Sequence, residues 1–188
     1  DLVAELLANE MLSSPEDEQG SGLENALCEV LPRLKGAFSF VLSDRDQIIG
    51  VRDPNGLRPL CLGRIDNGWV LASETPALDV IGAHMVREIS PGEAVVINND
   101  GCRSFWPFDA DLIDPKLCLF EFVYFARPDA FLYGQSVHHA RVRMGEFLSK
   151  QAPVEADLVM GVPESGIPAA EGYARESGIP YGQGLVKN

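Results

Sequence analysis

The chain has 188 residues, 46% of them hydrophobic, which is enough for one ordinary domain or two small ones with a buried core. Lys and Arg number 15 against 28 Asp and Glu, and the formal charge of -13 argues against a nucleic acid or an anionic membrane as the main partner. No apolar run approaches the roughly 20 residues of a membrane span, and the four cysteines form no CxxC pair, so we expect a soluble, cytoplasmic protein.

The first two predicted elements are helices. Apolar residues recur at helical spacing in "DLVAELLANEML" and again in "LENALCEVLPRL", and the acidic, turn-rich stretch "SSPEDEQGSG" joins the two. From residue 36 to 107, short β-rich runs alternate with Asp, Gly, Asn and Pro. This spacing predicts antiparallel strands, with one short helix near "TPALDVIGA".

A charged, proline-bearing stretch, "DADLIDPK", marks a boundary near residue 112. Beyond it we predict a strand in "CLFEFVYF", a helix over about 136–151, a strand in "ADLVMGVP", a helix over about 167–177 and a strand-like segment in "IPYGQGLVKN". Alternating strands and helices are typical of a parallel α/β sheet, whose ligands collect at the carboxyl ends of the strands.

The stretch "VMGVPESGIPAAEGYA" places Ser165 between a predicted strand and a predicted helix. Such a serine can cap the helix, and it can also take part in binding an anion at the unpaired N–H groups of the first turn. A serine-hydrolase nucleophile is disfavoured, because "PESGI" lacks the G-x-S-x-G elbow and neither Asp nor His follows it.

The stretch "GVRDPNGLRPLCLG" contains a strong turn signal, since Pro54 presets φ and Gly56 accepts positive φ. Arg52, Asp53 and Arg58 supply fixed charges beside it. The simplest interpretation is a hairpin stabilised by a local Arg and Asp pair.

Several stretches resemble a known family. "KGAFSFVLSDRDQIIGVRDPNGLRPLCLG", "GWVLASETPALD" and "EISPGEAVVINNDG" resemble the second half of the glutaminase domain of class II glutamine amidotransferases. "CLFEFVYFARPDA", "VHHARVRMGEFL" and "VEADLVMGVPESGIPAAEGYARESGIPYGQGLVKN" resemble amidophosphoribosyltransferases. The resemblance implies an α+β fold for residues 1–112, the C-terminal part of an Ntn-hydrolase-type glutaminase domain with antiparallel sheets. For residues 113–188 it implies an α/β fold, the junction and start of a type I phosphoribosyltransferase parallel sheet.

The same resemblance implies an enzyme that makes 5-phosphoribosylamine, glutamate and pyrophosphate from glutamine and phosphoribosyl pyrophosphate, the first committed step of purine biosynthesis. The chain opens without Met, and the family's catalytic N-terminal cysteine has no counterpart in it, so we expect an internal fragment that is inactive alone. Purine nucleotides as feedback inhibitors, Mg²⁺ as a cofactor and a homo-oligomer are further expectations from the resemblance.

The resemblance gives ligand roles to few residues of this chain. Glu164, Ser165 and Gly166 match the loop that binds pyrophosphate, with Ser165 also among the Mg²⁺ contacts, and Glu164 stands where many members have Asp. Cys118 matches the first of four cysteine ligands of a [4Fe-4S] cluster in many members, although a lone cysteine beside an apolar strand is more often simply buried. Lys187 falls where the family begins a flexible loop that closes over the substrate.

Other charged residues keep two interpretations. Arg127 and Asp129 form either a structural ion pair at the domain junction or part of the path between the two active sites. Arg141 and Arg143 either contact phosphates or belong to a solvated helix face, and the adjacent histidines of "VHHARV" point in different directions, which suits surface or capping roles.

Two other functions remain open. Another class II amidotransferase shares the "RDPxGxxPL" turn but would not continue into "VYFARPD". A non-catalytic nucleotide-sensing module would keep the phosphate loop and lack the catalytic parts.

Overall fold

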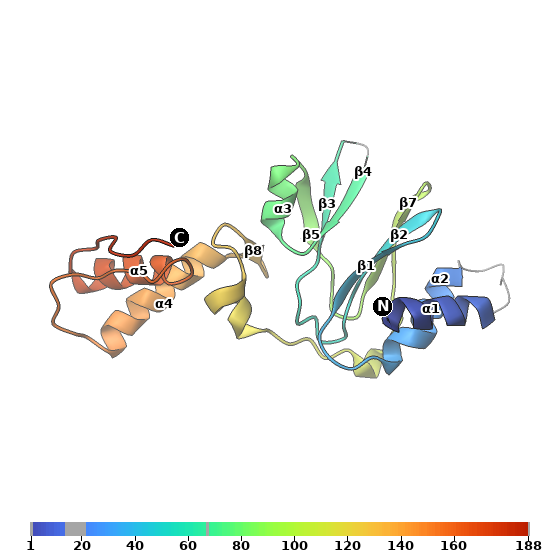
Figure 1. The fold of residues 1–188 in the computed structure, drawn as a ribbon, viewed down its shortest axis with the longest axis horizontal. Coiled ribbons are helices and arrows are strands. Elements are labelled where there is room, and N and C mark those ends of the chain that lie inside the picture. Colours follow the sequence, from blue (N-terminus) through green and yellow to red (C-terminus); the bar gives the residue numbers. More distant parts are fainter. Residues whose placement is uncertain (1, 14–21, 67, 188) are drawn as a thin grey trace. The chain divides into compact units, whose positions relative to one another are not determined.

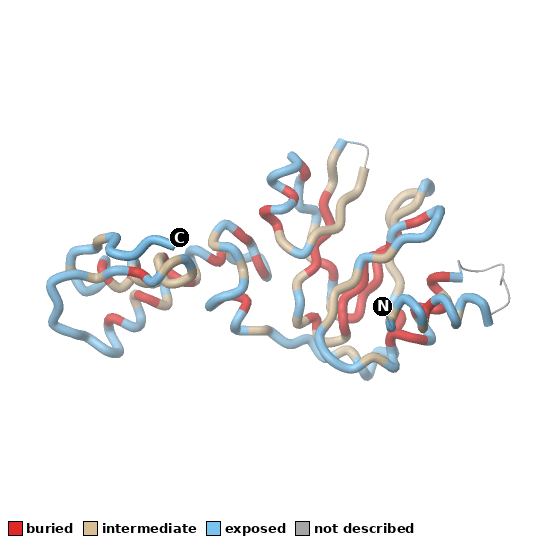
Figure 2. The backbone as a smooth tube through the Cα atoms, viewed as in Figure 1, coloured by how far each residue is buried: buried red, intermediate tan, exposed pale blue. Residues whose placement is uncertain are grey.

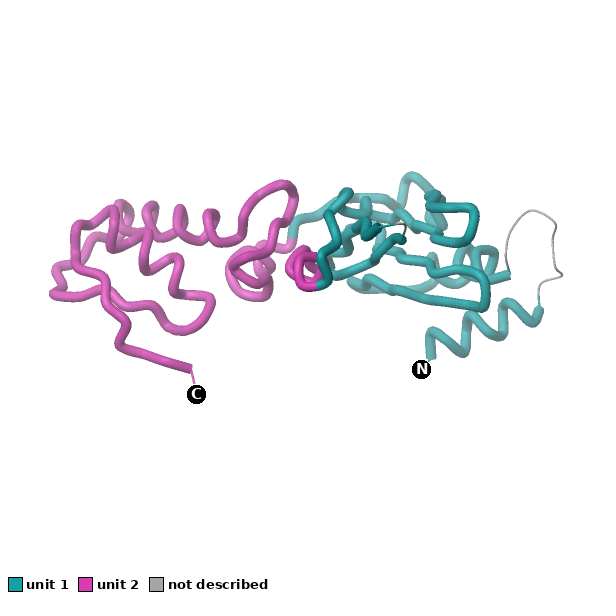
Figure 3. The backbone as a smooth tube through the Cα atoms, turned by 90° about the horizontal axis from the view of Figure 1, so that it is seen from above, with its two compact units in different colours: residues 1–73, 81–117 teal, residues 74–80, 118–188 magenta. Residues whose placement is uncertain are grey.

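The computed structural model describes residues 2–13, 22–66 and 68–187. It divides into two compact units: unit 1 comprises Asp1–Ser73 and Ile81–Leu117, and unit 2 comprises Glu74–Val80 and Cys118–Asn188 (Figure 3). The chain therefore passes from one unit to the other three times. Within the described residues, no helix has the length and apolar character needed to cross a bilayer.

Unit 1 contains two antiparallel sheets, with strand orders β1-β2-β6-β7 and β4-β3-β5 (Figure 1). The strands are β1 (Ser39–Ser43), β2 (Gln47–Arg52), β3 (Cys61–Ile65), β4 (Gly68–Ala72), β5 (His84–Glu88), β6 (Ala94–Asn98) and β7 (Gly101–Phe105). The predicted short β-rich runs are confirmed. The sequence pattern did not predict β7. The segment "GCRSF" has one strong strand former, and it takes its strand conformation from pairing with β6.

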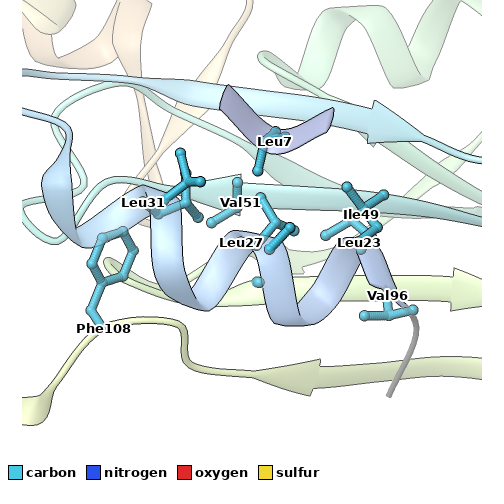
Figure 4. Packing of buried hydrophobic residues seen from close by; sticks show 11 residues of the cluster. Leu7, Leu23, Leu27, Leu31, Ile49, Val51, Val96 and Phe108 are labelled. Atoms are coloured by element: carbon cyan, nitrogen blue, oxygen red, sulfur yellow. The ribbon is translucent and has the colours of Figure 1, made fainter. Parts of the chain in front are cut away.

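The two predicted N-terminal helices, α1 (Leu2–Ser13) and α2 (Gly22–Val30), pack on the larger sheet, and the loop predicted between them falls outside the described residues. Leu27 and Leu31 lie against Ile49 and Val51 of β2, and all four are fully buried (Figure 4). Alternation along a strand brings residues two apart to the same face, so β2 presents this pair to the helices. Each such side chain stabilises the fold by about 1.5–3 kcal/mol.

A second cluster joins the two sheets of unit 1. It contains Leu60, Leu62, Ile89 and Val95, which are all buried. Buried stretches of the two sheets are drawn in red in Figure 2. A Cβ on Gly50 of β2 would come within 2.8 Å of the Leu71 side chain, so the glycine permits this close approach.

The turn after β2 holds the segment that leaves unit 1. Asp114 N–H donates to the Pro54 carbonyl (3.2 Å), and Lys116 N–H donates to the Asn55 carbonyl (2.8 Å). The Asn55 side chain donates in return to the Asp114 carbonyl (2.8 Å). The "DPNG" turn is therefore an anchor for the connection between the units.

Arg52 does not supply the Arg and Asp pair predicted for this turn. The buried Arg52 guanidinium donates to the carbonyls of Gly56, Arg58 and Ile89 at 2.5–3.0 Å. Asp53 accepts instead from backbone N–H groups, including that of Phe38 (3.2 Å). Consecutive residues at the end of a strand point to opposite sides, which separates the two charges.

Unit 2 is mainly helical, and its principal helices were predicted. They are α4 (Val137–Gln151) and α5 (Ile167–Ser177). The unit also contains the hairpin β8 (Phe131–Leu132) and β9 (Gln135–Ser136), and α3 (Thr75–Val80). Glycine permits the close crossing of α4 and α5: a Cβ on Gly145 would overlap the Ala169 carbonyl oxygen, and one on Gly172 would overlap that of Val142.

Three predicted strand segments of unit 2 require correction. The run "CLFEFVYF" contains a π-helical turn, η3 (Glu121–Phe125), because a wholly apolar run has no period that separates strand from helix. The segments "ADLVMGVP" and "IPYGQGLVKN" form a single parallel bridge within the described residues, between Val159 and Tyr181. The parallel pairing is therefore present but limited to that bridge.

Candidate phosphate site

The loop between Val159 and α5 is tightly folded. Gly166 N–H donates to the Val162 carbonyl (3.2 Å), and Ile167 N–H donates to that of Glu164 (3.3 Å). A Cβ on Gly161 would lie 2.6 Å from the Ile167 Cα, and one on Gly166 would lie 2.8 Å from the Val162 oxygen. Only glycine at both positions permits this loop conformation. In this conformation the loop backbone lies at the start of α5.

Ser165 does not cap α5. The N-cap residue is Gly166, whose backbone is helical, and no side-chain hydrogen bond closes this end of the helix. Within the described residues we find no hydrogen bond of the Ser165 hydroxyl. The capping interpretation is therefore not supported, and the hydroxyl stays available for a ligand.

A pocket of about 400 Å³ opens beside this loop, entirely within unit 2. Glu164 and Ser165 line it together with three cationic side chains, those of Arg127, Arg141 and Lys187. The Lys187 ammonium lies 4.0 Å from a Glu164 carboxylate oxygen, and both side chains are about two-thirds exposed. Three cations beside a helix start form an arrangement suited to a multiply charged anion.

Arg127 is held in place by Asp129. Its Nε donates to Oδ1 (3.0 Å) and its Nη2 to Oδ2 (2.9 Å), and both side chains are more than half exposed. This bidentate hydrogen bonding raises the pKa of Arg127 and lowers the pKa of Asp129. The predicted ion pair is present, and its arginine also lines the pocket.

Arg141 enters the pocket from α4, and it is 2% exposed. Its Nε donates to the Phe122 carbonyl (2.6 Å) and its Nη2 to the Ala126 carbonyl (2.7 Å), so it closes the end of η3. Burial lowers the pKa of Arg141 from its usual value. The solvated helix face expected for it is therefore wrong, whereas Arg143 is exposed and lies over the Phe147 ring (5.7 Å).

Other predicted residues lie elsewhere. Gly166 lines a second pocket of about 330 Å³ with Ser165 and Arg141. Cys118 is partly exposed and precedes η3. His139 is exposed in the first turn of α4, where its N–H donates to the capping Ser136 hydroxyl (3.3 Å). Among the described residues, no three His, Cys, Asp or Glu side chains gather closely enough to hold a metal ion.

Comparison with known proteins shows what the chain is similar to. The glutamine amidotransferase domain family matches residues 7–80. The amidophosphoribosyltransferase of Mycobacterium tuberculosis (strain ATCC 25618 / H37Rv) is 56% identical over 168 residues, which are 89% of this chain and 31% of that protein. Over 89% of its length the chain is therefore similar to an amidophosphoribosyltransferase.

Further relatives agree. The amidophosphoribosyltransferase of Synechocystis sp. is 46% identical over 191 residues, which cover 100% of this chain and 37% of that protein. A solved structure described as the glutamine PRPP amidotransferase of B. subtilis complexed with ADP and GMP has a TM-score of 0.87 and 42% identity, and the match covers 98% of this chain and 39% of that chain. The predicted resemblance and fold class are confirmed, and the chain spans about a third of the length of these amidophosphoribosyltransferases.

Arg141 could not be assigned to this pocket from the sequence alone. A signal was present, because Val137, Arg141, Gly145 and Ser149 recur every four residues along α4 and all are buried. A charged residue on such a ridge needs internal partners, and η3 supplies them.

Proposed function

We propose that the full-length protein is an amidophosphoribosyltransferase that converts glutamine and phosphoribosyl pyrophosphate into 5-phosphoribosylamine, glutamate and pyrophosphate in purine biosynthesis. Unit 1 is the C-terminal part of its glutaminase domain, and unit 2 is the junction and the start of its phosphoribosyltransferase domain. The observation that carries the proposal is the pocket in which Arg127, Arg141 and Lys187 meet the Ser165 loop. The high identity to amidophosphoribosyltransferases supports it.

The pocket suits the phosphate groups of such a substrate. Arginine guanidinium groups and a lysine ammonium bind phosphate oxygens with charge-assisted hydrogen bonds, and Glu164, Ser165 and Gly166 place backbone and hydroxyl groups beside them. Purine nucleotides carry the same phosphate chemistry, and a structurally similar protein is described as complexed with ADP and GMP. We therefore also propose purine nucleotides as regulatory ligands.

Two cofactors belong to the same proposal. The Ser165 hydroxyl and the Glu164 carboxylate are hard oxygen ligands of the kind that Mg²⁺ takes together with substrate phosphates. The partly exposed Cys118 thiol is suited to one ligand position of a [4Fe-4S] cluster. Iron and sulfide analysis of the full-length protein and its Cys118→Ser variant tests the cluster.

Steady-state assay of the full-length protein tests the function. We expect release of pyrophosphate and glutamate in equal amounts when both glutamine and phosphoribosyl pyrophosphate are supplied. Ser165→Ala should raise KM for phosphoribosyl pyrophosphate about tenfold or more, since a hydrogen bond to a charged group contributes about 1.5–3 kcal/mol. Ser177→Ala, at the far end of α5, should leave KM unchanged. Absence of pyrophosphate release from the wild type would contradict the proposed function.

A further inference from the structure

Asn55 and Gly56 stand together because the fold needs each of them. Gly56 has a φ of 62°, and a Cβ there would lie 2.6 Å from the Pro91 side chain, so only glycine fits. Asn55 supplies the side-chain donor to the Asp114 carbonyl (2.8 Å) and so holds residues 113–116, which we call the exit segment. In an asparagine followed by glycine, the next backbone nitrogen also reaches the side-chain amide most easily, because glycine has no Cβ to obstruct it.

The reaction open to this pair is deamidation. The Gly56 backbone nitrogen attacks Cγ of Asn55, the Cγ–Nδ2 bond breaks, and ammonia leaves with the proton of the Gly56 nitrogen. A water molecule then opens the cyclic succinimide at either carbonyl and leaves aspartate or isoaspartate at position 55. The attack needs a Gly56 nitrogen that is free of other hydrogen bonds and an Asn55 side chain turned towards the peptide bond that follows it.

In the folded chain neither requirement is met. The Gly56 N–H donates to the Asp53 carbonyl (2.9 Å), and the Asn55 side chain is held by its bond to the Asp114 carbonyl. The Lys116 N–H donates to the Asn55 carbonyl (2.8 Å), so the exit segment holds both the backbone and the side chain of Asn55. The Asn55 amide does not bind the Asp114 carbonyl and present Cγ to Gly56 at the same time. The reaction therefore has to wait until the exit segment detaches.

Deamidation would prevent the exit segment from binding again. An ionised carboxylate at position 55 has no N–H to donate, so its oxygen would face the Asp114 carbonyl oxygen. The buried Asp53 carboxylate, which accepts from the Asn55 N–H (2.9 Å), lies in the same turn and would repel the new charge. Isoaspartate would in addition lengthen the backbone of the turn by a methylene group.

We propose that Asn55 is a deamidation site gated by the exit segment. The site is closed while the segment is anchored on the turn, it reacts when the segment detaches, and the product does not restore the anchor. Water is the co-reactant, and the modification is a one-way release of the segment that leads out of unit 1. Residues 53–56 and 113–116 all belong to unit 1, so the site is independent of the proposed phosphate pocket.

Peptide mapping by mass spectrometry of the full-length protein, held at mildly alkaline pH, measures the deamidation rate at Asn55. We expect this rate to be about thirtyfold lower than in a synthetic peptide of residues 50–60, because two hydrogen bonds must break first and each contributes about fivefold. The Ile113 side chain packs on the core, where a Cβ on Gly92 would come within 2.8 Å of it. Ile113→Ala should therefore loosen the exit segment and raise the rate about fivefold, the share of the Asp114 bond. Leu112→Ala, at an exposed neighbouring position, should leave the rate unchanged.

A second measurement tests the release. Asn55→Asp reproduces one product of the reaction, and limited trypsin digestion reports on the exit segment through cleavage after Lys116. Cleavage needs the detached segment, so its rate follows the detached population. Asn55→Asp should raise this rate about fivefold or more, the factor of one net hydrogen bond. Asn98→Asp makes the same change of charge at the end of β6 and keeps the acceptor for the Asp100 N–H, so it should leave cleavage unchanged.

The results that would contradict the proposal are distinct. Equal deamidation rates in the folded protein and the peptide would overturn the gating. An unchanged rate in Ile113→Ala, or an equal increase in Leu112→Ala, would show that the exit segment is not the gate. Unchanged cleavage after Lys116 in Asn55→Asp would overturn the one-way release. Tryptophan emission checks that unit 1 of each variant is folded, and the comparisons with the peptide and with Asn55→Asp decide the proposal even if Ile113→Ala fails to fold.

Discussion

Replacing Arg141 by methionine tests how the floor of the pocket is built. The substitution keeps an unbranched side chain of similar length and removes the donors to the Phe122 and Ala126 carbonyls. Two hydrogen bonds from a charged donor contribute about 1.5–3 kcal/mol each, and relief of the buried charge offsets part of that sum, so we expect unit 2 to lose about 2–4 kcal/mol. Arg143→Met is the matched control, since Arg143 is exposed on the same helix and its stacking on Phe147 contributes about 0.5–1 kcal/mol.

The aromatic residues allow each unit to be followed separately during urea unfolding. Both tryptophans, Trp69 and Trp106, lie in unit 1, whereas all four tyrosines lie in unit 2. With a urea dependence of about 1–3 kcal/mol/M, Arg141→Met should lower the midpoint seen by tyrosine absorbance by roughly 1–2 M and leave the midpoint seen by tryptophan emission unchanged. Equal shifts for Arg141→Met and Arg143→Met would refute the assignment of the buried hydrogen bonds.

Two further predictions use the same measurements. Gly172→Ala places a Cβ against the Val142 carbonyl oxygen and should destabilise unit 2 by about 1–3 kcal/mol. Helix propensity alone would stabilise the unit by about 1 kcal/mol. The sign of the change in unfolding free energy therefore shows whether the close helix crossing or helix propensity dominates. Burial acts to raise the pKa of Glu93, but hydrogen bonds from Arg87, Ser104 and the Ser90 N–H lower it overall. The stability from this carboxylate is therefore present above its unfolded pKa of about 4.3 and is lost as the pH falls through the lower folded pKa. Wild type and Glu93→Gln should differ most in tryptophan-monitored stability near neutral pH and converge in acid; a constant difference would contradict this.

Elements with their own periodicity or end signals could be predicted from the sequence. The β-rich runs of unit 1 are separated by turn residues, and α5 ends at Gly178, whose φ of 75° suits glycine. The run from Cys118 to Phe125 had no such signal, because its conformation depends on Arg141, which lies 19 residues beyond Phe122. The buried hydrogen bonds of Arg52 could not be predicted for the same reason, since the Ile89 carbonyl, which accepts one of them, lies 37 residues away.

The residues of the candidate site also divide into those that the sequence predicts and those that only the fold brings together. Glu164, Ser165 and Gly166 are contiguous and precede a helix, so local sequence together with the family resemblance predicted them. Arg127 and Arg141 come from a turn and from another helix, and only the folded unit brings them to the same pocket. The place of α3 in unit 2 could not be foreseen, because its neighbours in sequence are strands of unit 1.

The charges around the pocket suit the proposed anion, although the net charge of the whole chain is -13. Arg127 is paired with Asp129, and Lys187 lies near Glu164, so these two cations are largely compensated. Arg141 differs, because within the described residues its partners are backbone carbonyls and it forms no ion pair. Carbonyl dipoles satisfy two of its five N–H donors without cancelling its charge. The pocket therefore keeps an uncompensated positive charge in a partly water-excluded place, where a phosphate oxygen gains more from it than at an exposed arginine.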